Sequence, residues 1–252
     1  RVVPTRTTLP ILSCVLFSSD GERLSVRSTN LEVSMEFSLS AEIKEPVNIA
    51  IPINKILNVT SSLKNEDLNV FIKDGFKVQI KTGFGEYNIM GVAPEDFPNK
   101  TEVVKNSSLN FSSKELEELI DYTISSCSTD DLKPALQGIL LNFNEANTTF
   151  VSTDGHRLSK IELEKNGPIS KNIILPVKFF KLVQSFLSEN ETIEFILGEN
   201  HVQVFFKGIN ISTRLIQDSY PDYEKVIPQN NEKSVVVKNE EMIASLKRIS
   251  SF

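Results

Sequence analysis

Residues 153–159 read Thr153-Asp154-Gly155-His156-Arg157-Leu158-Ser159 and stand between two segments with the composition of β-strands. The residues at 148–152 are rich in Thr, Phe and Val, and Asp-Gly is a strong signal for a tight turn. After the turn, Ile161 and Leu163 alternate with charged residues, which is typical of a half-buried strand. Leu158 shares parity with the charged residues. The alternation therefore predicts that Leu158 points toward solvent, unless a β-bulge returns it to the core.

A second copy of this element stands near the start of the chain, at an offset of 124 residues (153 − 29 = 124). Residues 29–37 alternate without interruption, which predicts that their apolar side chains face inward: Leu31, Val33, Met35 and Phe37. The other copy has Arg157 in place of Val33 and Leu158 in place of Ser34. Two copies of one fold are expected to share a pattern, so a local break in one copy indicates function.

The repeat extends over most of the chain, and recognising it prevents a wrong assignment of the fold. Four further pairs of segments match at similar offsets: residues 10–16 with 134–140 (134 − 10 = 124), 48–52 with 172–176 (172 − 48 = 124), 96–98 with 219–221 (221 − 98 = 123), and 109–126 with 235–251 (235 − 109 = 126). The last pair indicates that a third copy begins near the C-terminus. A unit of this length lies within the usual size of a domain.

The repeat predicts three domains, at residues 1–104, 105–229 and 230–252, of which the third contains only its opening strand and helix. Counting back one unit from residue 106 gives a negative position (106 − 124 = −18), so we expect 18 residues to be absent from the front of the first domain. The chain is therefore expected to be a fragment of a three-domain protein.

Composition is that of an ordinary folded protein, with 40% hydrophobic and 24% charged residues. The sequence has no apolar run long enough to span a membrane and no signal-peptide pattern. Cys14 and Cys127 are expected to be free thiols in a reducing cytosol, and no metal-ligand spacing or cofactor motif is present. The net charge of −6 argues against tight binding of nucleic acid over the whole surface, although a local basic lining remains possible.

Hydrophobic periodicity predicts that both copies combine antiparallel strands with few helices, which is an α+β class. Ser112 and Glu115 form a capping-box pattern before a helix with a buried stripe of Leu116, Leu119, Ile120 and Ile124. The first copy is expected to contain strands at 11–17, 23–29, 31–39, 68–73, 77–82 and 86–92 and a helix at 53–63. The second is expected to contain strands at 109–111, 137–143, 148–153 and 157–163, helices at 113–125 and 177–187, and three closing strands.

Five motifs together resemble the bacterial DNA polymerase III β subunits, the β sliding clamps. They are residues 153–159, 8–12 (Thr-Leu-Pro-Ile-Leu), 29–32 (Thr-Asn-Leu-Glu), 93–98 (Ala-Pro-Glu-Asp-Phe-Pro) and 220–223 (Tyr-Pro-Asp-Tyr). The resemblance covers essentially the whole chain. It implies the DNA clamp fold, in which repeated domains form a ring with antiparallel sheets outside and helices lining the inner face.

The resemblance also implies a function: a non-catalytic processivity factor of DNA replication that encircles duplex DNA without sequence specificity. The complete protein would be a homodimer in the cytoplasm, associated with the nucleoid. Its expected partners are the replicative polymerase, the clamp loader, translesion polymerases and repair proteins, which bind through a short linear peptide.

Candidate site residues follow from the same resemblance. The residues that match the family's peptide groove are Leu136, Thr153, Gly155, His156, Arg157, Leu158, Pro221, Lys225 and Val226. Lys225 stands where the family often has arginine. Arg6 matches a loop arginine that approaches DNA, and we add Lys133 as a DNA contact from its position in the equivalent loop. The orientation of the acidic helix at 113–125 relative to DNA stays open.

The sequence is also compared with two other classes of function, an enzyme and a scaffold. An enzyme could use Asp154 and His156 as a dyad, but adjacent turn residues seldom converge, and no nucleophile-elbow or metal-spaced motif is present. A scaffold that binds peptides without encircling DNA would use the same groove, so the sequence does not separate it from a clamp.

Overall fold

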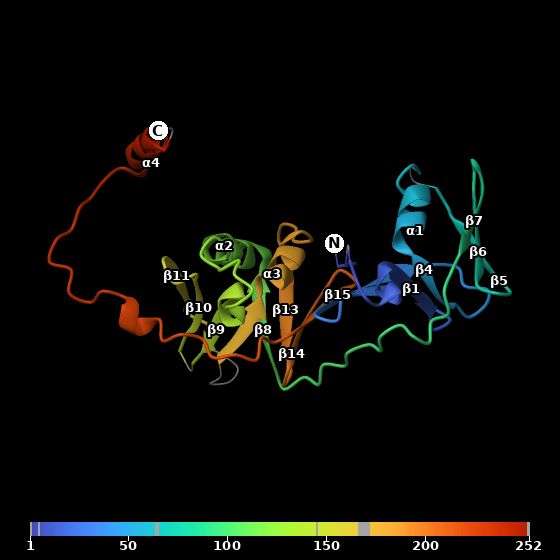
Figure 1. Ribbon diagram of the computed structural model, residues 1–252, viewed down its shortest axis with the longest axis horizontal. Helices are drawn as coiled ribbons and strands as arrows, with labels where there is room; N and C mark the ends of the chain where they lie inside the picture. The colour runs from blue at the N-terminus through green and yellow to red at the C-terminus, as the bar shows by residue number, and fades with distance from the viewer. Residues whose placement is uncertain (1, 5, 64–65, 145, 166–171, 251–252) are drawn as a thin grey trace. The chain divides into compact units, whose positions relative to one another are not determined.

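The computed structural model describes residues 2–4, 6–63, 66–144, 146–165 and 172–250. The chain divides into two compact units, Arg1–Ser219 and Tyr220–Phe252 (Figure 1). The first unit contains both long copies of the repeat except for the last residues of the second. The second unit contains the segment at which the third copy is expected to begin.

The elements of the first copy follow the predicted order. They are η1 (Pro10–Ser13), β1 (Cys14–Ser19), β2 (Arg23–Thr29), β3 (Val33–Ser40), β4 (Asn48–Pro52), α1 (Ile53–Thr60), β5 (Asn69–Lys73), β6 (Lys77–Thr82) and β7 (Gly85–Met90). The strand expected at 11–17 begins at Cys14, because Pro10 starts a short 3-10 turn in which the Leu12 N–H donates to the Leu9 carbonyl.

The second copy contains the same series with one more strand and helix at its start. Its elements are β8 (Ser107–Ser112), α2 (Ser113–Ile124), η2 (Pro134–Gln137), β9 (Gly138–Phe143), β10 (Thr148–Thr153), β11 (Leu158–Leu163), β12 (Asn172–Pro176), α3 (Val177–Gln184), β13 (Thr192–Leu197), β14 (His201–Phe206) and β15 (Ile209–Arg214). Both halves of the capping box at Ser112 and Glu115 are formed, which confirms the predicted start of α2.

The strands form three antiparallel sheets, which confirms the α+β class. The largest sheet has the order β4-β1-β2-β3-β15-β14-β13-β8, so it runs through both copies and joins them by the pairing of β3 with β15. The other two have the orders β11-β10-β9-β12 and β5-β6-β7. Helix α2 contacts α3, β10 and β11, and the two helices lie side by side over the strands of the second copy (Figure 1).

The main core lies under these two helices. Leu116, Leu119 and Ile120 of α2 are almost fully buried, and Ile124 packs beside them, so the predicted apolar stripe is confirmed. The ring of Phe111 packs edge-on against Phe150 and Phe195, with centroid distances of 5.7 and 5.1 Å. Aromatic pairs in this geometry contribute stability beyond that of the buried area alone.

One expectation about the first copy is wrong. Val33 and Met35 are buried and Phe37 packs against the core, but Leu31 is 57% exposed. Its φ angle of 74° belongs to a left-handed turn, so Leu31 precedes the strand and its side chain does not follow the alternation.

The second unit contains η3 (Glu224–Val226) and α4 (Asn239–Ile249). Helix α4 matches the helix expected in the third copy, with acidic residues in its first turn and basic residues in its last. The strand expected before it is not formed among residues 220–250, where no partner strand is present. An isolated strand leaves its backbone groups unpaired.

Candidate functional site

The turn between β10 and β11 is held by the side chain of Thr153. Its Oγ1 accepts the Gly155 N–H at 3.0 Å and donates to the Arg157 carbonyl at 2.7 Å. Gly155 has a φ angle of 93°, a conformation that glycine adopts without steric cost. The turn therefore presents the side chains of residues 156–158 from a fixed backbone.

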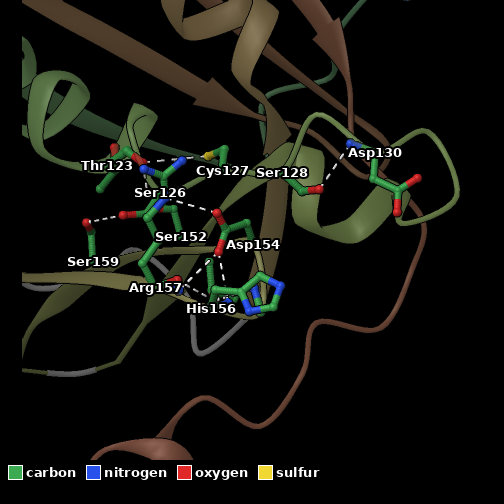
Figure 2. Close-up of polar contacts among 12 residues, drawn as sticks. Thr123, Ser126, Cys127, Ser128, Asp130, Ser152, Asp154, His156, Arg157 and Ser159 are labelled. Carbon is green, nitrogen blue, oxygen red and sulfur yellow. Dashed lines mark hydrogen bonds and ion pairs between the residues drawn. The ribbon is translucent and has the colours of Figure 1, made fainter. Parts of the chain in front are cut away.

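Asp154 supplies the second set of contacts (Figure 2). Its Oδ1 accepts the N–H groups of His156 at 2.9 Å and Arg157 at 3.0 Å, and its Oδ2 accepts the Arg157 Nε–H at 2.9 Å. These backbone hydrogen bonds, together with the guanidinium, lower the pKa of the Asp154 carboxyl to about 2. The Asp154 carboxylate thus organises the turn and orients Arg157.

The first copy contains the same turn, with the same hydrogen bonds from the threonine and from the Oδ1 atom of the next residue. Thr29 Oγ1 accepts the Leu31 N–H at 3.1 Å and donates to the Val33 carbonyl at 3.1 Å. Asn30 Oδ1 accepts the N–H groups of Glu32 and Val33 at 3.0 and 2.7 Å. Threonine and the Asp or Asn that follows it therefore belong to the fold. The differences between the copies lie in the side chains that the turn displays.

Arg157 ends the turn and Leu158 begins β11, so the strand expected from residue 157 starts one residue later. The pairing of β10 with β11 continues without an extra residue from Thr148↔Leu163 to Thr153↔Leu158, so the bulge considered from the sequence is absent. Leu158 is partly exposed and shares a face with the exposed Lys160. The Arg157 side chain is 65% exposed.

The turn is also fixed to the C-terminal end of α2 (Figure 2). The hydroxyls of Ser126 and Ser159 lie 2.7 Å apart, and Ser152 Oγ donates to the Thr123 carbonyl at 2.6 Å. Cys127 lies beside them as a buried free thiol, and burial raises its pKa to about 11, which makes it inert near neutral pH. Sequence reasoning missed these serine contacts, because no motif links Ser126 with Ser159.

Leu136 and Lys133 lie at the same end of this sheet as the turn. Helix η2 leads directly into β9, and β9 runs antiparallel to β10, so the start of β9 is next to the end of β10. Leu136 is buried at 9% exposure, whereas Lys133 is exposed and its carbonyl accepts the Leu136 N–H. The structure thus places Leu136, Thr153, Gly155, His156, Arg157 and Leu158 on neighbouring elements.

Three other predicted groove residues belong to the second unit and are described separately. Pro221 and Val226 are exposed. Lys225 Nζ lies 2.8 Å from Asp222 Oδ2, and this hydrogen-bonded carboxylate raises the pKa of Lys225. Lys225 is therefore a charged donor held close to a local acid.

The contacts of Asp154 argue against the enzymatic alternative. Its carboxylate is bound to the two backbone N–H groups and to the Arg157 guanidinium, and its contact with His156 is to the backbone. Within the part of the chain that the structure describes, no three His, Cys, Asp or Glu residues are placed to bind a metal. The helices in that part are also too short or too polar to cross a membrane.

Comparison with known protein families shows to which family the chain belongs. The model of the DNA polymerase III beta subunit N-terminal domain matches residues 1–101, and the model of its central domain matches residues 110–222. The two matches lie in the family's own order and together cover most of the chain. The chain belongs to the DNA polymerase III beta subunit family. The domain boundary predicted at 104 lies between the two matched segments, and the exact boundaries stay a prediction.

Individual beta subunits agree with this assignment. The beta sliding clamp of Pseudomonas aeruginosa is 30% identical over 239 residues, which cover 93% of this chain and 65% of that protein. The chain thus spans a little less than two thirds of that relative. A crystal structure of the DNA polymerase III subunit beta from the same organism has a TM-score of 0.91 at 28% identity and covers 98% of this chain and 68% of that one. Another crystal structure of a DNA polymerase III subunit beta from P. aeruginosa, bound to griselimycin, has a TM-score of 0.89 at 28% identity with the same coverage.

Proposed function

We propose that the protein acts as a DNA sliding clamp, a non-catalytic ring that encircles duplex DNA and tethers a replicative polymerase and other proteins to it. The observation that supports this most strongly is the match of two successive beta subunit domains in family order. The ring would be a homodimer, with repeated domains supplying sheets on its outside and helices on its inside. Domains with boundaries near residues 104 and 229 are part of the proposal.

The exposed faces of α2 and α3 are suited to sliding. The charges on these faces cancel, because three exposed lysines stand with three exposed acidic residues: Lys114, Lys178 and Lys181, and Glu117, Glu118 and Asp121. Asp121 Oδ1 also accepts a hydrogen bond from Gln184 Nε2 at 2.7 Å. Each strong phosphate contact adds salt-dependent affinity, so a nearly neutral lining would let DNA pass without trapping it. Topology, rather than affinity, would then retain the ring on DNA.

Arg6 and Lys133 are the proposed direct DNA contacts. Both are exposed and both precede a short 3-10 helix, η1 after Arg6 and η2 after Lys133, so they occupy similar places in the two copies. Flexible cations of this kind contact phosphates without reading bases, as sliding requires.

The turn at residues 153–158 and Leu136 would form one wall of a peptide groove. The other residues that match the family's groove, Pro221, Lys225 and Val226, belong to the second unit. Leu158 offers apolar surface and the buried Leu136 would form the floor beneath the groove. Gly155 allows close approach of a peptide backbone, and His156 and Arg157 supply donors. The clamp solved with griselimycin shows that a relative binds a ligand, which supports a binding site in this family. Lys225 presents a single charged amine rather than the planar fork of an arginine.

The competing proposal is a scaffold that binds the same peptides without encircling DNA. Retention on DNA separates the two. A sliding clamp loaded onto nicked circular duplex should remain bound and should dissociate once the circle is cut to a linear form with free ends. Equal residence on circular and linear DNA would contradict the clamp, and failure to associate with circular DNA even with a clamp loader would favour the scaffold.

Substitution of Arg6 tests the direct contact in the same assay. Arg6→Ala should weaken DNA association by about 1 kcal/mol or less, as expected for one exposed phosphate contact. The matched control is Arg23→Ala, which removes another exposed arginine of the first copy. If both variants lower association equally, Arg6 has no specific role.

A further inference from the structure

A cleft lies on the first copy of the repeat, at the turn that corresponds to residues 153–158 of the second copy. It has a volume of about 540 Å3 and lies between the loop before η1 and the turn at residues 29–31. Its lining includes Leu9, Leu12, Leu31, Asn30 and Arg6. The cleft is open to solvent, and its lining is mostly apolar with a few polar groups, which is the composition of a binding surface.

Leu31 is the unusual residue of this cleft. It adopts a left-handed φ of 74°, which is disfavoured for a leucine, and its side chain is 57% exposed. The second copy has Gly155 in the same turn, with the same hydrogen bonds to the preceding threonine. The turn therefore does not need an aliphatic side chain here. A strained residue that displays an apolar side chain into a cleft is better explained by binding than by folding.

The other leucines complete an apolar surface with a buried base. Leu9 is 47% exposed beside the cleft, whereas Leu12 is 3% exposed and belongs to a hydrophobic cluster of the first copy. Leu31 is held rigidly, because Thr29 Oγ1 accepts its N–H and Asn30 Oδ1 accepts the next two. A rigid wall lowers the entropy cost of binding.

The charge of the cleft points to the chemistry of its occupant. Among the described residues that line it, Arg6 is the one charged side chain, and the remaining polar groups are neutral. The contact with DNA proposed above uses Arg6 alone among these residues, so a phosphate backbone would leave the three leucines of the cleft without a partner. A ligand with a large apolar group and one nearby carboxylate matches this surface.

We propose that the cleft binds a short linear peptide, whose aliphatic or aromatic side chain inserts between Leu9 and Leu31 and whose acidic residue pairs with Arg6. This is a second docking site, separate from the groove proposed at Leu158. A partner that carries two such peptides, or two partners at once, would then occupy both copies of the repeat.

The test is a fluorescence-anisotropy titration with the labelled synthetic peptide Asp-Glu-Asp-Leu-Leu-Phe. All proteins carry Leu158→Ser, so that the groove proposed above does not contribute to the signal. Leu31→Asn removes the aliphatic side chain and keeps a residue that tolerates the left-handed turn. We expect its affinity for the peptide to fall about tenfold, as for an apolar anchor. The matched control is Leu39→Asn, which alters a leucine of similar exposure (47%) outside the cleft, and should leave the affinity unchanged.

Several outcomes would overturn the proposal. Equal peptide affinities of the Leu31→Asn and Leu39→Asn proteins, with both folded by thermal melting, would remove Leu31 from any site. Self-association in sedimentation that Leu31→Asn abolishes would assign the cleft to a second copy of the chain. If the peptide fails to bind but short duplex DNA binds, and Arg6→Gln abolishes the DNA binding, the cleft would be a DNA contact. Complete loss of peptide binding in the Leu158→Ser protein would also overturn the proposal, because the cleft would then have no measurable affinity for the peptide, whatever the role of the Leu158 groove.

Discussion

Replacing Leu158 by serine separates a binding role from a folding role. Complete burial of a leucine contributes about 1.5–3 kcal/mol. Leu158 is partly exposed and lies on the face of β11 that also carries the exposed Lys160, outside the described core clusters. We therefore expect only part of that free energy, about 1 kcal/mol, to be lost when the side chain is shortened.

The first copy of the repeat shows what serine would do at this position. Ser34 pairs with Thr29 across the strands as Leu158 pairs with Thr153. Ser34 Oγ donates to Thr29 Oγ1 at 2.7 Å. A serine at 158 can make the same bond to Thr153, and a hydrogen bond of this kind contributes about 0.5–1.5 kcal/mol. The two effects nearly cancel, so the free energy of unfolding should change by less than about 1 kcal/mol.

Denaturant unfolding measures this change, with Ile161→Ser as the matched control. Ile161 lies on the same strand but on the opposite face, where it packs against the main core. Its replacement should cost about 2 kcal/mol or more, as is typical of removing a large aliphatic side chain from a core. An equal loss for both variants would show that Leu158 is a core residue, and the parity argument would fail.

Binding supplies the other half of the prediction. A peptide that uses the groove should lose about 1–3 kcal/mol of binding free energy with Leu158→Ser, the range for an apolar anchor. Isothermal titration on the protein used for unfolding measures it. Unchanged affinity in a stable variant would remove Leu158 from the groove.

Two further substitutions test the turn and the sheet beneath it. The depressed pKa of Asp154, about 2 when folded, means that its stabilising effect is complete above the ordinary carboxyl pKa of about 4 and is lost as the pH falls through about 2. Asp154→Asn should keep the backbone contacts, as Asn30 does, and Tm should then fall less steeply between about pH 4 and pH 2. The same pH profile of Tm in both proteins would show that the Asp154 carboxylate does not stabilise the turn. Gly138→Ala should lower the free energy of unfolding by about 1–3 kcal/mol, because the added methyl would lie 2.4 Å from Ile174 Cγ2. An unchanged Tm would show that β9 and β12 can move apart to accommodate the methyl at no cost.

The strands and helices were largely predictable because their periodicity is local and occurs twice. Residues 23–29, 77–82 and 148–153 form strands with the predicted bounds. The position of Leu158 followed from alternation alone, since no bulge interrupts β11. Leu31 shows the limit of the same reasoning. Alternation assumes an extended backbone, and the turn hydrogen bonds of Thr29 and Asn30 place Leu31 in a left-handed conformation before the strand starts.

The support beneath the site was less predictable, because it depends on contacts between distant segments. Ser126 at the end of α2 meets Ser159 of β11, and Ser152 meets the Thr123 carbonyl. No local pattern distinguishes these serines from those in loops. Comparison of the copies would have shown that Asp154 holds the turn. Asparagine, which stands at the equivalent position 30, has the same size and an Oδ1 atom that accepts the same backbone hydrogen bonds.

The surroundings of the two equivalent positions explain why one carries serine and the other leucine. At Ser34, strand β15 pairs with the outer edge of β3, with Ser212 opposite Ser34. The space left there is a cavity of only about 10 Å3, bounded by Glu36 and Lys100, whose charged groups lie 2.5 Å apart. A leucine would not fit in so small a polar cavity. Strand β11 is the edge of its sheet among the described strands, and by analogy with the pairing of β3 with β15 the repeat predicts a strand of the third copy beside it. An apolar side chain in place of serine is therefore compatible with the described surroundings of Leu158, and it supplies the apolar surface that the proposed groove requires.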